Sequence, residues 1–386
     1  MTKFSFYALL TTLLLGFSNY AQAQVEADWD SGIRMNMGSE SYLNLGGRLH
    51  LDYASINDDV TPIDGGFEVR RARVSLRGRF SNDWRLALDW DEGTVSGWKN
   101  AFVQYRGFDK LIITAGNQLV PFGLEANGSS NNEVFMERAL PDALNSHFLM
   151  GLGIRSSGSN WTLNGGYFGN GLSDSDTVTS DGTSVAGRFT FAPILTKSKV
   201  VHLGLAAEFR ELNSNSGYRV RARPESYANT ERLIDTGIID DASKVSTFGL
   251  EAAALMGRFS MQGEYVTANI SRDLGPEVTL DGGYIQASMF LSGGHRRYSK
   301  SNGTFRAPKL KGKSGAWEIA ARYSTLNLQD QDITGGEETN LTLGLNWYVN
   351  PQIRLMFNAI HGEVSPNSNG IDESVDILQV RFQAAI

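Results

Sequence analysis

The stretch that decides the fold is FEVRRARVSLRGRF, residues 67–80. From its fifth residue onward, polar and apolar side chains alternate strictly. The polar positions are Arg71, Arg73, Ser75, Arg77 and Arg79, and the positions between them are Ala72, Val74, Leu76, Gly78 and Phe80. A period of two is typical of a β-strand whose two faces meet different surroundings. One face is apolar and the other carries four guanidinium groups, so the rest of the chain must supply both environments.

The amino terminus has the pattern of a secretory signal peptide. Lys3 precedes an apolar run over residues 4–17, and Ala21-Gln22-Ala23 forms a small-x-small cleavage site. The run is shorter than the roughly 20 residues that a membrane helix needs, and no later segment is long and apolar enough. The sequence therefore predicts a signal peptide over residues 1–23, export of residues 24–386, and no helical membrane domain.

The composition fits a chain with one face in lipid and the other in water. Mean hydropathy is −0.25, as expected when apolar and polar residues alternate along every strand. Cysteine is absent, so an exported chain of this length must be held by packing or by a closed hydrogen-bond network. The formal net charge is −7, and bulk charge gives no sign of anion binding.

Alternating segments recur along the chain and predict 16 strands. They lie at 42–53, 67–80, 84–91, 97–106, 110–117, 148–156, 160–168, 183–192, 199–210, 244–256, 257–268, 280–291, 315–326, 339–349, 352–361 and 375–386. Their lengths are near the ~9–11 residues that cross a bilayer at a tilt. An even number of such strands predicts one all-β domain over residues 24–386, a 16-stranded antiparallel transmembrane β-barrel.

The connections mostly alternate between tight and long, as in outer-membrane barrels with short periplasmic turns and long outer loops. The long connections are predicted at 54–65, 118–147, 170–182, 211–243, 327–338 and 362–374. Residues 24–40 are expected to form an irregular arm. The basic segment 292–314 falls where a short turn is expected, so it either borders the periplasmic mouth or is a solvated connection.

Aromatic residues recur near the expected strand ends and predict interface girdles. They are Tyr53, Trp84, Trp98, Trp161, Tyr284, Trp317, Trp347 and Tyr348. The alternative is the ordinary preference of aromatic residues for strands. The signal peptide and the even strand count favour the girdles.

The cost of placing arginine in lipid decides which way residues 67–80 face. One arginine on the lipid face costs ~2–4 kcal/mol at the bilayer midplane. Four would cost on the order of 10 kcal/mol, comparable with the ~5–15 kcal/mol net stability of a domain. The arginines must therefore point into a watery lumen, where they attract anions and repel cations.

A second basic run, YRVRARP at residues 218–224, also has a period of two. It places Arg219, Arg221 and Arg223 on one side. Guanidinium groups bind phosphate and carboxylate oxygens in a bidentate manner. The three could form a ladder for an oxyanion, or they could be separate charges on a solvated loop.

Together these residues make the chain similar to the phosphate-selective porin O/P family over nearly the whole mature sequence. The similarity is carried by Arg70-Arg71-Ala72-Arg73, Gly116 with Phe122-Gly123-Leu124-Glu125, Ser129-Ser130, Glu137-Arg138, residues 200–205 (VVHLGL), Arg219/Arg221/Arg223, residues 315–318 (GAWE) and residues 343–348 (LGLNWY). The resemblance implies a homotrimer of 16-stranded barrels. In each barrel the loop at about 118–147 would fold inward and narrow the pore.

The resemblance also implies roles for individual arginines. Arg70, Arg71 and Arg138 would lie around the constriction, beside the lumen-facing Arg73 and Arg77. Arg219, Arg221 and Arg223 would form the outer ladder. Because the period of two sets Arg70 and Arg71 on opposite faces, a bulge or the end of the strand must let both contribute.

The chain departs from the family pattern at three positions. Phosphate-specific members carry lysines on the constriction loop where this chain has Ala126 and Asn131. Family members place an acidic group near the constriction, and Lys99 occupies the corresponding position in this chain. These departures favour general anion preference by the strand arginines over tight phosphate binding at the constriction.

Other chemistry finds no support in the sequence. With no cysteine and five scattered histidines, no metal-ligand spacing is visible. No phosphate-binding Gly-rich loop, no serine nucleophile with a positioned base, and no cofactor motif is present. In an exported chain the basic segment 292–314 does not indicate nucleic-acid binding.

We therefore predict a passive, water-filled, anion-selective channel in the outer membrane of a Gram-negative bacterium. Its expected partners are outer-membrane lipid, two further copies of the chain, and small anions such as phosphate or polyphosphate. Two alternatives remain open. One is a general porin of the same family with weak anion preference and no phosphate site, and the other is a non-conducting structural barrel.

Overall fold

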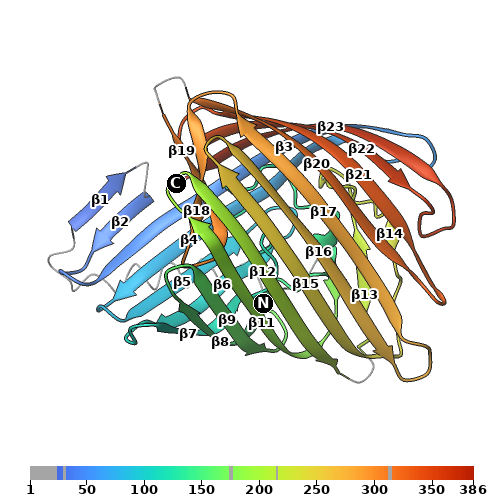
Figure 1. The fold of residues 1–386 in the computed structure, drawn as a ribbon, viewed down its shortest axis with the longest axis horizontal. Helices are drawn as coiled ribbons and strands as arrows, with labels where there is room; N and C mark the ends of the chain where they lie inside the picture. The colour runs from blue at the N-terminus through green and yellow to red at the C-terminus, as the bar shows by residue number, and fades with distance from the viewer. Residues whose placement is uncertain (1–23, 29–31, 174–176, 214–215, 312–314) are drawn as a thin grey trace.

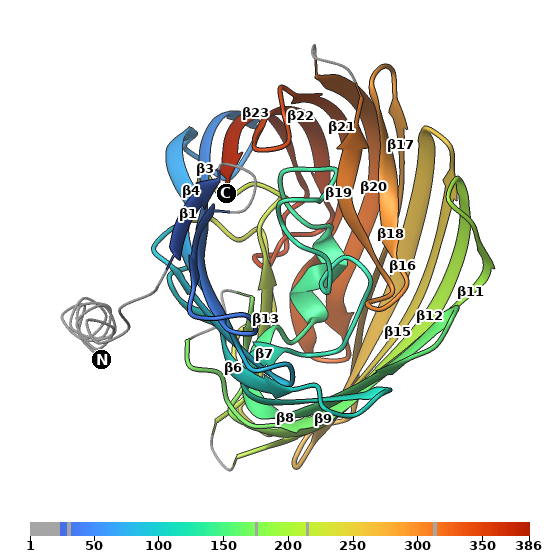
Figure 2. The ribbon, with the colours of Figure 1, turned by 90° about the vertical axis from the view of Figure 1, so that its left-hand side faces the viewer.

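A computed structural model of the chain describes residues 24–28, 32–173, 177–213, 216–311 and 315–386. Sixteen antiparallel strands pair edge to edge into a closed barrel (Figures 1 and 2). They are β3 (Tyr42–Asp58), β4 (Gly66–Phe80), β5 (Trp84–Asp91), β6 (Gly97–Tyr105), β7 (Leu111–Leu119), β8 (Phe148–Ser157), β9 (Trp161–Phe168), β11 (Gly182–Leu195), β12 (Lys199–Leu212), β15 (Ala242–Met256), β16 (Phe259–Arg272), β17 (Val278–Phe290), β20 (Ala316–Asp330), β21 (Ile333–Tyr348), β22 (Ile353–Val364) and β23 (Glu373–Ala385). The barrel closes where β23 pairs with β3, from Val375↔Asp58 to Ala385↔Arg48. The predicted all-β barrel of 16 strands is confirmed, whereas the predicted signal peptide lies outside the described residues.

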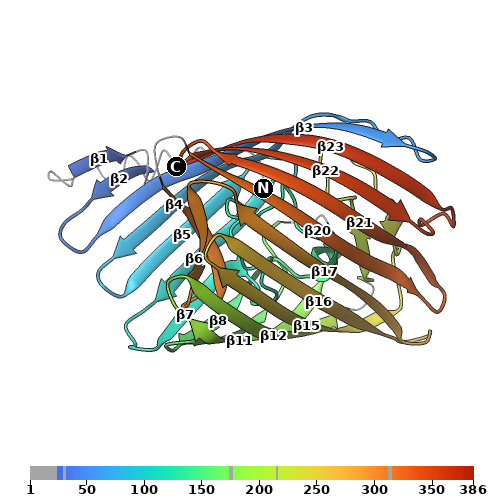
Figure 3. The ribbon, with the colours of Figure 1, turned by 45° about the horizontal axis from the view of Figure 1, so that its top comes forward.

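The strands run obliquely around the barrel (Figure 3). Their outer faces are apolar, whereas their inner faces carry many buried polar side chains beside one apolar cluster that includes Val266, Ile270 and Leu280. On β21, Leu341 and Leu343 are 50% and 57% exposed, whereas Asn340 and Thr342 are fully buried. A soluble protein has the opposite arrangement, with apolar side chains inside. Apolar side chains on the outside and polar ones within are what a lipid-facing barrel requires. No helix in the described part of the chain is long and apolar enough to cross a membrane.

A β-bulge at the outer part of β4 turns two consecutive arginines inward. His50 on β3 pairs with Arg71, but the next residue, Leu51, pairs with Val69. Arg70 is therefore the extra residue of the bulge, and both Arg70 and Arg71 are buried. Bulges re-aim a side chain in this way, often beside functional sites. The predicted need for a bulge or a strand end at this point is confirmed.

Three segments lie inside the barrel (Figure 2). The connection between β7 and β8, residues 120–147, enters the lumen and contains the short 3-10 helix η1 (Leu140–Leu144). The connection between β12 and β15 contributes β13 (Arg219–Ala222), which pairs with β10 (Val178–Thr179) and β14 (Ile234–Asp235). The third is the hairpin of β18 (Gly294–Ser299) and β19 (Thr304–Leu310). The predicted inward-folded constriction loop is confirmed.

Two expected connections have regular structure instead. Where an irregular arm was expected, β1 (Gln24–Asp28) pairs with β2 (Gly32–Asn36), and β2 also pairs with β3. The expected loop at 327–338 is a tight turn between β20 and β21, whose pairing continues to Asp330↔Ile333. In both places the residues pair with the backbone N–H and C=O groups of a neighbouring strand. A local sequence pattern cannot predict this pairing.

Within the basic segment 292–314, residues 294–310 form a hairpin rather than a solvated connection. Arg188 on β11 donates from Nη1 to the carbonyl of Asn302 (3.1 Å) and from Nη2 to that of Gly303 (2.8 Å), so the hairpin tip lies on the inner wall. Two predicted girdle residues also face inward, because the hydroxyl of Tyr284 donates to Glu264 and that of Tyr348 donates to Glu318.

Candidate functional site

The inner surface encloses a cavity of about 1070 Å³ between the barrel wall, the 120–147 loop, β13 and the β18–β19 hairpin. Among the residues that the structure describes, eleven arginines and one lysine line it, against six carboxylates. The protein as a whole carries a net charge of −7, so the lumen and the whole molecule have opposite charge. Low-dielectric walls focus the field of such a lining into the water-filled space.

Seven of the eight predicted site residues line this cavity. They are Arg70, Arg71, Arg73, Arg77, Arg138, Arg221 and Arg223. The eighth, Arg219, lies on β13 but not on the cavity wall, and its guanidinium group makes two hydrogen bonds to Asp235 (2.8 and 2.5 Å). The structure thus brings together residues from β4, the loop and β13 that are far apart in the sequence.

Glu137 of the loop holds the loop to the wall at the β4 bulge. Arg70 donates to both of its carboxylate oxygens, each at 2.8 Å, and Arg381 on β23 also pairs with it. Burial by itself raises the pKa of Glu137, but the positive charges of Arg70, Arg381 and Arg71 outweigh burial and lower it. Glu137 is therefore an ionised internal counter-ion that occupies the bidentate position of Arg70.

The next two arginines of β4 are held by carboxylates of the neighbouring strand. Arg73 pairs with Asp91 at 2.9 Å, and Arg77 pairs with Asp89 at 2.7 Å, both across the β4–β5 ladder. The side chain of Arg77 remains 40% exposed, whereas that of Arg73 is only 10% exposed. These pairs fix the guanidinium groups in place while Arg77 keeps contact with lumenal water.

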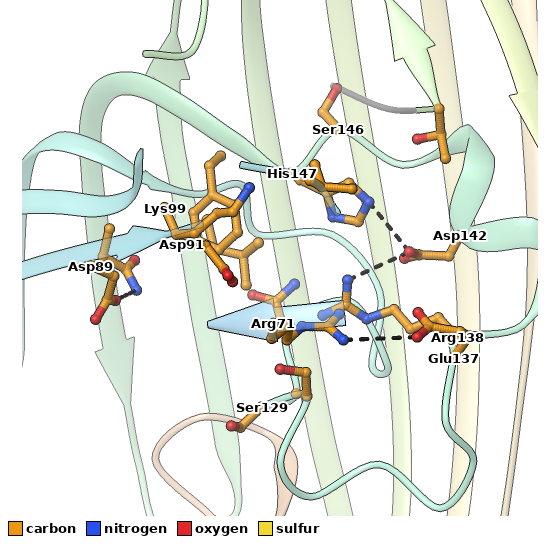
Figure 4. Close-up of a pocket in the computed structure, with 18 of the residues that line it drawn as sticks. Arg71, Asp89, Asp91, Lys99, Ser129, Glu137, Arg138, Asp142, Ser146 and His147 are labelled. Atoms are coloured by element: carbon orange, nitrogen blue, oxygen red, sulfur yellow. Dashed lines mark hydrogen bonds and ion pairs between the residues drawn. The ribbon is translucent and has the colours of Figure 1, made fainter. Parts of the chain in front are cut away.

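Arg138 braces the loop internally. It pairs with Glu133 at 3.1 Å and with Asp142 at 3.5 Å, and it donates to the carbonyl of Ala126 (3.2 Å). His147 lies 3.3 Å from the same Asp142 carboxylate (Figure 4). Most donors of Arg138 are therefore used to shape the loop.

Arg71 has a different environment from its neighbours. It is 9% exposed, it lies 3.9 Å from Glu137 Oε1, and its Nη1 has no hydrogen-bond partner among the described residues. Figure 4 shows its side chain extending into the pocket between the loop and the wall. Arg70, Arg73 and Arg77 each donate a hydrogen bond to a carboxylate, whereas Arg71 has, in the described part of the chain, only the longer ion pair with Glu137.

An aromatic ring lies between the outer basic run and the constriction. The guanidinium carbon of Arg223 lies 4.3 Å from the ring centroid of Tyr227, and that of Arg70 lies 3.7 Å from the same centroid. Cation–π contacts at these distances stabilise both cations beside one ring. The ring therefore connects the outer basic run to the β4 bulge.

The loop is anchored to the opposite wall through its backbone. The amides of Leu124 and Glu125 donate to the Glu264 carboxylate at 2.7 and 2.8 Å. Arg354 donates to the carbonyls of Glu133 (2.7 Å) and Val134 (3.0 Å). Contacts on both sides of the barrel fix the loop across the lumen.

The hairpin from the other end of the barrel meets the loop. Arg296 on β18 makes two 2.9 Å hydrogen bonds to Glu318 and donates to the carbonyl of Asn132 on the loop (2.7 Å). The hairpin also brings Arg297 and Arg306 to the cavity wall. Two elements that enter from opposite ends thus narrow the lumen together.

Five cationic lining residues were not among the predicted site residues. They are Arg48, Lys99, Arg210, Arg297 and Arg306. Arg48 could have been found from its inward position on the first predicted strand, where it pairs with Arg73. Arg297 and Arg306 carried no such signal, because nothing in a basic connection predicts that it turns into the lumen.

The two loop positions that lack lysines do not line the cavity. Ala126 is buried at 1% exposure, and Asn131 lies against β3, where its side-chain oxygen is 3.0 Å from His50 Nε2. Neighbouring residues of the loop, Ser129 and Ser130, do line the cavity. Over the described residues, no group of histidine and acidic side chains could hold a metal ion.

Comparison with known proteins identifies relatives of the whole chain. The family described as "Phosphate-selective porin O and P" matches residues 43–386. Porin O of Pseudomonas aeruginosa is 28% identical over 382 residues, with 86% of each chain covered. Among solved structures, the anion-selective porin from Comamonas acidovorans has a TM-score of 0.59 at 14% identity, and covers 90% of this chain and 100% of its own. The trimer form of OmpT from Vibrio cholerae has a TM-score of 0.56 at 9% identity over 90% of this chain and 100% of its own.

Proposed function

Because the chain belongs to the phosphate-selective porin O and P family, we propose that it is an outer-membrane channel that selects anions, with phosphate or polyphosphate as its main solutes. Porins are passive channels rather than enzymes. The observation that carries the proposal is the cavity lining, which over the described part of the chain has twelve cationic side chains against six carboxylates. A field of this sign raises the local concentration of anions and lowers that of cations.

The proposed path runs from the outer basic run to the constriction. Arg221 and Arg223 on or beside β13 contact the anion first, and Tyr227 connects them to Arg70. Arg71 lines the cavity beside them, and its only carboxylate contact among the described residues is the 3.9 Å ion pair with Glu137. Adjacent sites of moderate strength allow an ion to enter and also to leave, which conduction requires.

Phosphate fits this lining better than chloride does on chemical grounds. Its oxygens accept two parallel hydrogen bonds from one guanidinium group, whereas a spherical ion gains only charge attraction. Within the protein itself, the carboxylate of Glu137 makes this bidentate contact with Arg70. We include Arg70, Arg73, Arg77, Arg138 and Arg219 in the proposal as residues that set the local field while their own carboxylate partners hold them.

The proposal includes a homotrimer in outer-membrane lipid. Its support is the apolar outer face of the barrel and the trimer form of the Vibrio cholerae structure, which shares the fold. Chemical cross-linking of the protein in outer-membrane vesicles tests this point. Trimers on denaturing gels are expected, and only monomers would contradict it.

Uptake into proteoliposomes tests the solute. Vesicles with the purified protein are given labelled phosphate, labelled chloride or labelled sodium at pH 7. Phosphate and chloride should enter faster than sodium, and phosphate should compete with chloride. Entry of sodium at the rate of chloride would contradict the proposal, and entry of none of the three would identify a structural barrel.

A general porin without a phosphate site is the second candidate. It is favoured by Ala126 and Asn131, which place no lysine on the loop, and by the carboxylate partners of four predicted site arginines, Arg70, Arg73, Arg77 and Arg138. Such a channel would pass phosphate without any competition between phosphate and chloride. Competition at low phosphate concentration would exclude it.

A further inference from the structure

Glu225, in the connection between β13 and β14, is a buried carboxylate on an unusual backbone. It is 3% exposed, and its φ is +50°. A left-handed backbone is uncommon for a residue with a side chain, and it persists only where the surrounding contacts hold it. The amide of Glu225 donates to the carbonyl of Arg223 (2.7 Å), so the chain turns sharply here. The turn, residues 223–227, places the guanidinium group of Arg223 over the ring of Tyr227.

The barrel wall holds Glu225 through four side chains. Arg322 on β20 and Thr342 on β21 donate to one carboxylate oxygen, the latter at 3.0 Å. Ser324 on β20 donates to the other oxygen. Gln379 on β23 donates to the backbone carbonyl of Glu225 at 3.1 Å. Three strands thus fix one residue of the turn, and Arg322 is the charged member of the set.

Arg322 also holds the constriction loop. Its Nη1 donates to the carbonyl of Glu137 (3.0 Å), and its guanidinium carbon lies 4.5 Å from the ring centroid of Phe135. The carboxylate of the same Glu137 holds Arg70 on β4. One buried guanidinium group therefore joins the two segments that enter the barrel beside each other, the 120–147 loop and the connection that carries β13 (Figure 2).

Apolar packing holds β13 independently of Arg322. Val220 and Ala222 are buried in an apolar cluster that also contains residues of η1. Of the part of the chain that the structure describes, the turn at 223–227 adds no side chain to this cluster. The turn therefore depends on Glu225 for its place on the wall, and loss of that contact should release the turn while β13 stays.

We propose that Arg322 is a positioning residue of the anion path. Through Glu225 it fixes Arg223 and Tyr227 beside the β4 bulge, and through Glu137 it ties their position to the constriction loop. Arg322 is 1% exposed and does not belong to the described lining of the cavity, so it acts through the residues that it holds. The attraction of a cation for an anion weakens with distance, and a displaced Arg223 contributes less to the path.

The inference rests on the proposed anion channel, and its first test depends on a sign. Glu225→Ala removes a negative charge from the cavity lining. By charge alone, the ratio of chloride to potassium permeability would rise. Because the turn is released and Arg223 moves away, we expect this ratio to fall by about threefold. The zero-current potential across a planar bilayer in a potassium chloride gradient at pH 7 measures it.

The second test keeps the charge. In Arg322→Lys, an ammonium group replaces a planar fork and cannot hold Glu225 and the Glu137 carbonyl together. The permeability ratio should again fall, whereas a role in the local field alone predicts no change. This variant also decides the question should Glu225→Ala not assemble. Glu363→Ala is the matched control, because it removes an exposed carboxylate of β22 and should leave the ratio unchanged.

Hydrogen–deuterium exchange locates the effect in the turn. The amides of residues 223–227 should exchange faster in Glu225→Ala and in Arg322→Lys, while those of residues 219–222 keep their rates. Faster exchange of β13 to the same extent would contradict the separate anchoring of the turn.

The failure of the positioning role is distinguishable from the failure of the channel. If the unchanged protein prefers potassium, the proposed function falls and the positioning role falls with it. If it prefers chloride and either variant keeps or raises the permeability ratio, only the positioning role falls. Chloride preference that weakens in both variants, with faster exchange confined to the turn and to the constriction loop, supports both.

Discussion

Glu137 holds the constriction loop to the wall, and its replacement by glutamine tests that role. The carboxylate accepts two 2.8 Å hydrogen bonds from Arg70 and pairs with Arg381, and all three side chains are buried. Glutamine keeps the shape and removes the charge. The change leaves Arg70 without a carboxylate, while Arg381 keeps its pair with Asp52.

The expected cost follows from the burial of the pair. Removing one partner of a buried ion pair costs about 3–5 kcal/mol when the other charge stays buried. The loop can respond by leaving the wall, whereas the closed ladder of 16 strands does not depend on it. We therefore expect the opening equilibrium of residues 133–140 to rise by roughly 10²–10⁴-fold, since each 1.4 kcal/mol is a factor of ten.

Hydrogen–deuterium exchange followed by mass spectrometry measures this equilibrium directly. In the Glu137→Gln variant the loop amides should exchange faster by that factor, while the strand amides keep their rates. Single-channel conductance should rise in parallel, because the lumen widens. Glu363→Gln is the matched control, because this glutamate on β22 is 71% exposed and lies far from the loop in sequence.

Unchanged exchange of residues 133–140 in the Glu137→Gln variant would refute the reasoning. It would mean that the backbone contacts to Glu264 and Arg354 hold the loop without the ion pair. Faster exchange throughout the barrel would also contradict it, because the loop would then support the strands rather than rest on them.

Three further predictions follow from the same structure. Arg221→Ala should lower phosphate flux more than chloride flux in proteoliposomes, and equal losses would show that the outer arginines set only the local field. Arg296→Met should raise single-channel conductance, because it removes the contact of the hairpin with Asn132; an unchanged conductance would show that the hairpin does not narrow the lumen. Leu343→Arg places a charge on the lipid face and should lower the free energy of unfolding in urea by about 2–4 kcal/mol, whereas no loss would argue against a lipid-facing β21.

The barrel could be predicted from the sequence because the alternating pattern of each strand has a local physical cause. Lipid on one side and water on the other impose a period of two on every strand, and residues 67–80 show it directly. Even the bulge at Arg70 could be predicted, because two adjacent arginines cannot share one face of a regular strand. The tight turn between β20 and β21 was missed because both strands extend beyond the apolar part of the pattern.

The charge pairing inside the lumen could not be predicted in the same way. Arg70 pairs with Glu137 and Arg381 pairs with Asp52, and these partners are separated by dozens to hundreds of residues. Which arginine keeps free donors depends on these pairs, so a row of equivalent guanidinium groups in the sequence becomes a set of unequal ones in the structure. The inward turn of the β18–β19 hairpin has the same cause, because Arg188 and Glu318 hold it from distant strands.

The central claim is that the lumen prefers anions, and the zero-current potential across a planar bilayer tests it most directly. The purified protein is placed between potassium chloride solutions that differ about tenfold in concentration at pH 7. The account predicts a potential close to the equilibrium potential of chloride, which becomes smaller in the Arg71→Ala variant. A potential close to that of potassium would contradict the account.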